Sequence, residues 1–118
     1  MADLLACVST GQGTWGHVRK VMDGEDWDYI FLVISPLVKE KFVHKKPFTV
    51  IEIKEDLTIT ELKDNLKSQL QGKLHGMEVG VNIISGTGKE HTALLMAIME
   101  LGFGIRFVYA TKEGINVV

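Results

Sequence analysis

The sequence predicts an α/β domain of Rossmann-like, doubly wound design, and three observations support this prediction. Short, continuous apolar runs alternate along the chain with segments of helical periodicity, the pattern of strands buried on both faces and joined by crossover helices. Two glycine-rich segments, residues 9–14 and 85–88, each follow one of these runs. The 118 residues are enough for one domain with a substantial core, so a single domain over residues 1–118 is expected.

Five apolar runs are expected to form the strands. They are residues 4–8, 29–34, 48–53, 79–84 and 105–109, and residues 115–118 are a candidate for a last short strand. Both prolines stand at boundaries of these segments, where a residue without an N–H group does not interrupt a hydrogen-bonded ladder.

Helices are expected over residues 14–22, 37–42 and 89–101, and a further one begins at a capping box. In that box Thr58 precedes Glu61 by three residues, and leucines follow at helical spacing. Alternation of strands and helices implies right-handed crossovers. The simplest arrangement is a mainly parallel, five-stranded sheet in the order 3-2-1-4-5 with helices on both faces, in which the winding reverses between the first and fourth strands.

Composition limits the classes of function. The net charge is −2, so no global positive field attracts long nucleic acid, and an anionic ligand requires a local site. The single cysteine, Cys7, excludes an intrachain disulfide and a paired-cysteine metal motif, and we expect no metal and no cofactor. The first residues include no basic leader followed by an apolar stretch, so a cytoplasmic protein without a membrane partner is expected.

The two glycine-rich segments supply the candidate ligand-binding residues. Each joins the carboxyl end of a predicted strand to the start of a predicted helix, and the sheet order places both at the crevice where open α/β sheets bind ligands. Glycine allows backbone N–H groups to approach a ligand, and helix N-termini carry a partial positive charge, so the segments suit a phosphate. The candidates are Ser9, Thr10, Gly11, Gln12, Gly13 and Thr14, together with Ser85, Gly86, Thr87, Gly88 and Lys89.

Two better-known phosphate motifs fit less well. Gly11, Gly13 and Gly16 have the spacing of the dinucleotide fingerprint, but Ser35 and Pro36 follow the second strand where an acidic ribose partner is required. A small NAD-binding protein therefore remains an alternative. A P-loop is excluded, because it needs glycine at position 83 and a hydroxyl residue at position 90, which are Ile and Glu.

Other residues have two interpretations each. His17 and His91 begin helices and are either ligand contacts or exposed caps. Trp15 is expected to be a core or interface anchor, with a base-stacking role as the alternative. The basic run at residues 39–46 is a solvated face or a ligand rim, and the glycine-rich segments themselves could be simple turns.

Residues 81–89 and the apolar helix after them resemble the characteristic segment of CRISPR-associated Rossmann-fold (CARF) domains. In that family an Asn or Asp in the fourth strand precedes a hydroxyl–glycine–threonine turn and a helix rich in Ala and Leu; Asn82, Ser85, Gly86 and Thr87 match this pattern. The family also has a hydroxyl- and glycine-containing loop after the first strand, and residues 9–14 are similar.

The resemblance implies a homodimer that binds cyclic oligoadenylate across its two-fold axis. An effector domain usually follows the sensor in this family; we expect none here, and so expect a stand-alone module that senses or sequesters the messenger. The alternatives are a metal-independent ring nuclease, with Lys89 and His91 as candidate catalytic residues, and an interaction domain without a ligand. Whether the protein is an enzyme is left open, with binding favoured.

Overall fold

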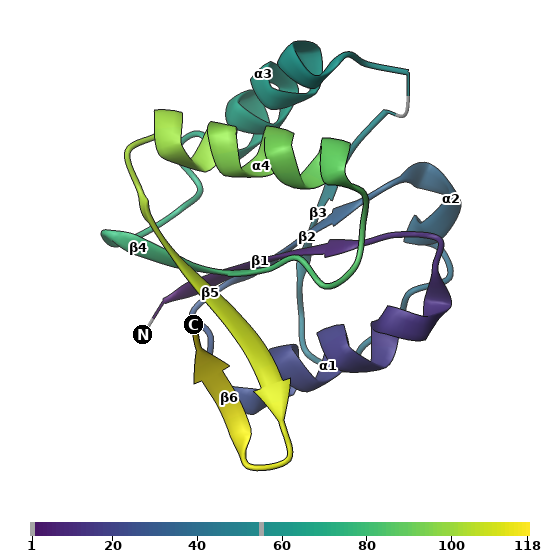
Figure 1. The fold of residues 1–118 in the computed structure, drawn as a ribbon, viewed down its shortest axis with the longest axis vertical. Helices are drawn as coiled ribbons and strands as arrows, with labels where there is room; N and C mark the ends of the chain where they lie inside the picture. The colour runs from purple at the N-terminus through teal and green to yellow at the C-terminus, as the bar shows by residue number, and fades with distance from the viewer. Residues whose placement is uncertain (1, 55) are drawn as a thin grey trace.

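The structure is a computed structural model that describes residues 2–54 and 56–118, and the six strands of this part of the chain form one sheet between two helical layers (Figure 1). The strand order is β3-β2-β1-β4-β5-β6. The first five strands are parallel and have the predicted order, with the winding reversed between β1 and β4. The five-stranded prediction was incomplete, because the antiparallel strand β6 extends the sheet beyond β5.

The strands are close to the predicted apolar runs. They are β1 (Asp3–Val8), β2 (Ile30–Ile34), β3 (Thr49–Glu52), β4 (Glu78–Asn82), β5 (Gly104–Thr111) and β6 (Gly114–Val117). Only Lys112 and Glu113 separate β5 from β6, and so short a connection can form a hairpin but not the crossover that a parallel neighbour needs. Strand β6 is therefore antiparallel.

The helices are α1 (Trp15–Gly24), preceded by a 3₁₀ turn over Gln12–Thr14, then α2 (Pro36–Lys39), α3 (Ile59–Leu70) and α4 (Gly88–Glu100). The helix predicted over residues 37–42 is a single turn. After it, the N–H groups of Lys41 and Phe42 both donate to the carbonyl oxygen of Val38, at 2.9 and 3.1 Å, and Phe42 buries its ring against Trp15 with the two ring centroids 5.6 Å apart. No helix among the described residues is long and apolar enough to cross a bilayer.

The core has two parts, one on each face of the sheet. Helices α3 and α4 cover one face, and α1 and α2 cover the other. Strand β1 contributes alternate residues to both parts: Leu5 and Cys7 face α3 and α4, whereas Leu4, Ala6 and Val8 face α1 and α2. Every residue of β1 is buried, which fixes the position of the loop that follows it.

Candidate functional site

The loops after β1 and β4 are in direct contact. The backbone N–H of Ser9 donates a hydrogen bond to Ser85 Oγ at 2.9 Å, and the two serine hydroxyls lie 3.2 Å apart. Ser85 is 1% exposed, so its hydroxyl joins the two loops from the inside. The predicted proximity of the two glycine-rich segments is thus present in the structure.

The β1 loop is fastened to the first helix. The indole Nε1 of Trp15 donates to the carbonyl oxygen of Ser9 at 2.7 Å, and the hydroxyl of Thr14 donates to the carbonyl oxygen of Gly11 at 3.1 Å. Trp15 is 6% exposed and packs against Phe42. It is a core anchor, and its ring is not available as a platform for a base.

The β4 loop turns sharply at Gly86, which has a φ of +106°. A Cβ atom there would lie 2.9 Å from both Glu90 Oε1 and His91 Nε2, so the position requires glycine for conformation and for space. His91 donates from Nε2 to the carbonyl oxygen of Ser85 at 2.7 Å and so supports the turn.

Helix α4 begins with a capping box. Thr87 Oγ1 accepts a hydrogen bond from the N–H of Glu90 at 3.2 Å, and Glu90 Oε1 accepts one from the N–H of Thr87 at 2.9 Å. Gly88 is the first helical residue, and the N–H of a first helical residue has no acceptor within its own helix. The geometry presents this end of α4, with its partial positive charge, at the carboxyl edge of the sheet.

A cavity of about 270 Å³ opens beside these loops. Of the predicted ligand-binding residues it gathers Ser9, Thr10, Thr87 and Lys89. Gln12 lines an adjoining hollow of about 140 Å³ that shares Thr10. The remaining candidates shape the loops without lining either space: Gly11, Gly13, Thr14, Ser85, Gly86, Gly88 and His91.

Five further residues line the cavity and were missed by the sequence-based prediction. Ile53 and Leu62 form an apolar part, Ser35 and Lys54 add a hydroxyl and a positive charge, and Glu90 adds its carboxylate. Ser35 directly follows β2, and residues 53 and 54 directly follow β3. The predicted strand order already placed these strand ends beside β1, so a search of every strand's carboxyl end could have found them.

Charge at the site is mixed. Hydrogen bonds from the backbone and then the hydroxyl of Thr58 hold the pKa of Glu61 below its usual value, and the nearby Lys89 ammonium adds a smaller effect. Beneath the loops, burial raises the pKa of the Cys7 thiol to about 12, with a smaller contribution from the Glu90 carboxylate. Among the described residues that line the cavity, Lys54 and Lys89 therefore supply positive charge, and Glu90, which the capping box holds in place, supplies a carboxylate.

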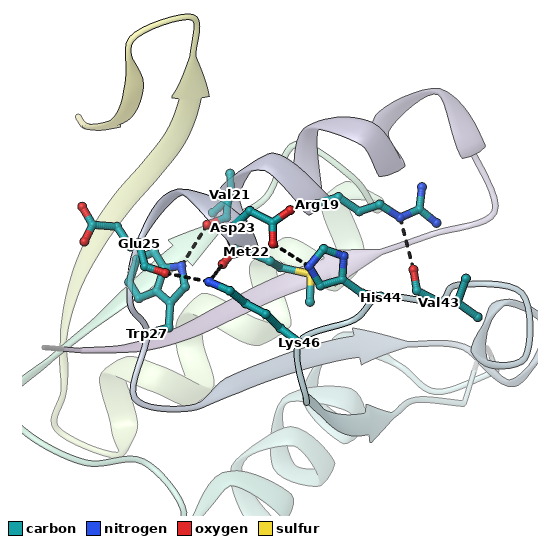
Figure 2. A network of polar contacts seen from close by, with 9 residues as sticks. All are labelled: Arg19, Val21, Met22, Asp23, Glu25, Trp27, Val43, His44 and Lys46. Atoms are coloured by element: carbon teal, nitrogen blue, oxygen red, sulfur yellow. Dashed lines mark hydrogen bonds and ion pairs between the residues drawn. The ribbon is translucent and has the colours of Figure 1, made fainter.

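The basic run at residues 39–46 is partly engaged in structural contacts (Figure 2). Lys46 Nζ donates to the carbonyl oxygens of Met22 and Glu25 at 2.8 and 3.0 Å, and so caps the C-terminus of α1, whose last turn has no basic residue of its own. His44 Nε2 lies 2.9 Å from Asp23 Oδ1 in the same network. None of the lysines of this run lines the 270 Å³ cavity.

The glycines with dinucleotide-fingerprint spacing do not perform that fingerprint's roles. Gly11, Gly13 and Gly16 all lack a positive φ. A Cβ atom at Gly13 or Gly16 would meet nothing within 4 Å, so neither allows a close packing of helix against strand. The geometry therefore gives the NAD alternative no support.

His17 lies outside the cavity. Its Nε2 accepts a hydrogen bond from the N–H of Ala110 at 3.3 Å, and the ring lines a separate hollow of about 190 Å³ beside β4 and β5. A larger cavity of about 440 Å³ contains Trp27, Tyr29 and Phe48. Its residues precede or begin β2 and β3, at the amino edge of the sheet, whereas open α/β sheets bind ligands at the carboxyl edge.

Comparisons with known proteins identify no relative: no protein-family model matches the sequence, and a search of curated proteins finds no match. Among residues 2–54 and 56–118, no group of three or more His, Cys, Asp and Glu side chains is arranged to hold a metal ion.

Proposed function

We propose that this chain is a nucleotide-binding module whose ligand occupies the cavity beside the β1 and β4 loops. The observation that carries the proposal is the joining of these loops through Ser9 and Ser85, next to a cavity lined by Thr10, Thr87 and Lys89. It lies at the carboxyl edge of the sheet where the winding reverses, the position at which open α/β sheets bind ligands.

The chemistry of the lining suits a phosphate attached to a larger, partly apolar group. The ammonium groups of Lys54 and Lys89 attract the anion, and the α4 N-terminus adds its dipole. The hydroxyls of Thr10 and Thr87 are potential donors to phosphate oxygens. Ile53 and Leu62 offer apolar surface to a sugar or base. Inorganic phosphate alone would leave this apolar part without a contact.

The ligand we propose is a cyclic oligoadenylate at a site shared by two copies of the chain. Pockets for organic ligands measure about 300–1,000 Å³, so 270 Å³ is small for a ring of several nucleotides. Two such cavities facing each other across a two-fold axis would provide the remaining volume. The similarity of residues 81–89 to the CARF segment supports the same ligand and symmetry.

Sensing or sequestering is favoured over cleavage. His91 was a candidate general base, but its Nε2 donates to the carbonyl oxygen of Ser85 and the ring does not line the cavity. A general base must reach the proton that it removes. Cyclic oligoadenylate incubated with the protein in EDTA should therefore stay intact by chromatography. Linear products that disappear in a Lys89→Ala, His91→Ala double variant would instead establish a ring nuclease.

Calorimetric titration of cyclic tetra-adenylate tests the binding proposal. Lys89→Ala should weaken binding by roughly ten- to a hundred-fold, since hydrogen bonds to charged groups contribute about 1.5–3 kcal/mol. Lys73→Ala is the matched control, because Lys73 is exposed in the turn after α3 and lines no part of the cavity. Equal affinities for both variants would contradict the assignment of the phosphate site.

A further inference from the structure

Ser35 is a buried residue whose hydroxyl has no hydrogen-bond partner among the residues that the structure describes. The residue is 5% exposed, and it lines the 270 Å³ cavity. It occupies the N-cap position of α2, yet its side chain makes no capping hydrogen bond. The backbone supports the turn instead, because the carbonyl oxygen of Ser35 accepts from the N–H groups of Val38 and Lys39, each at 3.1 Å.

The hydroxyl is not sealed off by protein, because Asp3 Oδ1 is the only fully enclosed polar side-chain atom without a partner among the described residues. It opens onto the cavity instead, where water or a ligand can form a hydrogen bond with it. A serine hydroxyl is both donor and acceptor, so it can pair with a ligand hydroxyl or a phosphate oxygen, and the position of Ser35 decides between them. Here the side chain has no local structural role and lines the proposed binding cavity, which assigns the missing partner to the ligand.

The position of Ser35 fits the sugar of a nucleotide. Val8 pairs with Ile34 in the sheet, so Ser35 follows β2 directly beside Ser9 at the end of β1. Neighbouring strands lie about 4.8 Å apart, which places the end of β2 about 10 Å from the end of β4 across β1. A ribose-phosphate unit with its phosphate near Thr87 and Lys89 can extend its sugar over that span toward Ser35.

We propose that Ser35 recognises a ribose 2′-hydroxyl and so makes the cavity selective for ribonucleotides over deoxyribonucleotides. This inference rests on the proposed nucleotide-binding function and goes beyond it by naming the residue that reads the sugar. In a 3′–5′-linked cyclic oligoadenylate the 2′-hydroxyl is the sugar's only free hydroxyl. Ser35 acts on binding alone, and no covalent step is involved.

The experiment compares the affinities of cyclic tetra-adenylate and its all-2′-deoxy counterpart for the full chain. Wild type should bind the ribose ring about three- to ten-fold more tightly per Ser35 contact. Ser35→Ala should reduce this ratio to about one, Ser35→Thr should keep it because the hydroxyl remains, and Ser68→Ala, an exposed serine on α3, should leave it unchanged. Thermal midpoints establish that each variant is folded.

The outcomes separate the two proposals. If neither ring nor 5′-AMP binds, the proposed function is wrong and the role of Ser35 is wrong with it. If both rings bind wild type equally, nucleotide binding stands and the role of Ser35 is wrong. Discrimination that persists in folded Ser35→Ala also overturns that role. Should Ser35→Ala not fold, the ratios for wild type and Ser35→Thr decide.

Discussion

Gly86 and Gly88 lie two residues apart in the β4 loop, and the structure assigns them different consequences on substitution. At Gly86 an alanine would have a φ of +106° and a Cβ 3.2 Å from Cys7 Cβ as well as close to Glu90 and His91. We expect Gly86→Ala to lower the free energy of unfolding by roughly 1–3 kcal/mol. Gly88→Ala is the control, because nothing lies within 4 Å of its Cβ position. Urea denaturation measures both, and equal losses would contradict this description of the turn.

Cys7 should be chemically inert in the folded protein. Its pKa of about 12 leaves almost no thiolate at pH 8, and the thiolate is the reactive form. Alkylation by iodoacetamide is therefore expected only when urea unfolds the chain. Because the folded-state pKa is raised, the stability linked to this proton is complete below pH 9 and is lost as the pH rises toward 12. Cys7→Ala should remove that part of the alkaline loss, and rapid labelling of native protein would refute the burial.

Two helices start with the same capping box but in different settings, and this allows stability and binding to be separated. Thr58 and Glu61 cap α3, and Thr87 and Glu90 cap α4. Thr58→Ala and Thr87→Ala should each cost about 1 kcal/mol of stability. Only Thr87→Ala should also weaken binding of cyclic tetra-adenylate, since Thr87 lines the cavity and Thr58 does not. A matching loss of affinity in both variants would show that the effect is merely structural.

At the scale of elements, the sequence predicted helices and strands correctly where a local residue pattern alone determines them. The Thr58 box predicted the start of α3, and the buried apolar runs predicted five parallel strands in their order. Helix α2 was predicted too long: it ends at Lys39, and the chain continues through turns whose N–H groups bond to Val38. Phe42 then packs against Trp15, a long-range contact that periodicity does not encode. The hairpin partner β6 was only a candidate, because the predicted runs 105–109 and 115–118 leave five residues between them, whereas in the structure β5 extends to Thr111 and β6 begins at Gly114.

The candidate site was predictable only in part, for the same reason. Glycine and hydroxyl residues identified the loops after β1 and β4. Ser35 and Lys54 carry no motif and become relevant only because adjacent strands end together. Ser85 was predicted to bind the ligand, and its role in joining two loops 76 residues apart is a property of the tertiary structure. The assignment of the predicted residues to a ligand stays a prediction.

At the scale of the whole molecule, we expect a homodimer that brings two cavities together. Met96 and Met99 are 39% and 66% exposed on the outer side of α4, the helix that starts at the cavity. Such apolar exposure is suited to a two-fold contact. Sedimentation should give a dimer at micromolar concentration that Met99→Glu weakens, whereas Met77→Glu, before β4 and 85% exposed, should not. A wild-type monomer, with or without cyclic tetra-adenylate, would remove the shared-site model.

The alternation of β1 between the two parts of the core has a consequence for the motions of the fold. Its amide protons are paired with or enclosed by β2 and β4, and its side chains are needed on both faces. Solvent can reach those amides only when both layers separate, so their deuterium exchange should report global unfolding. Edge strand β6, with Asn116 and Val117 exposed, can open alone and should exchange first. The β1 loop, which contacts the β4 loop through Ser9 and Ser85, thus extends from the strand that we expect to exchange most slowly, and the proposed ligand would meet a surface that is already ordered before it arrives.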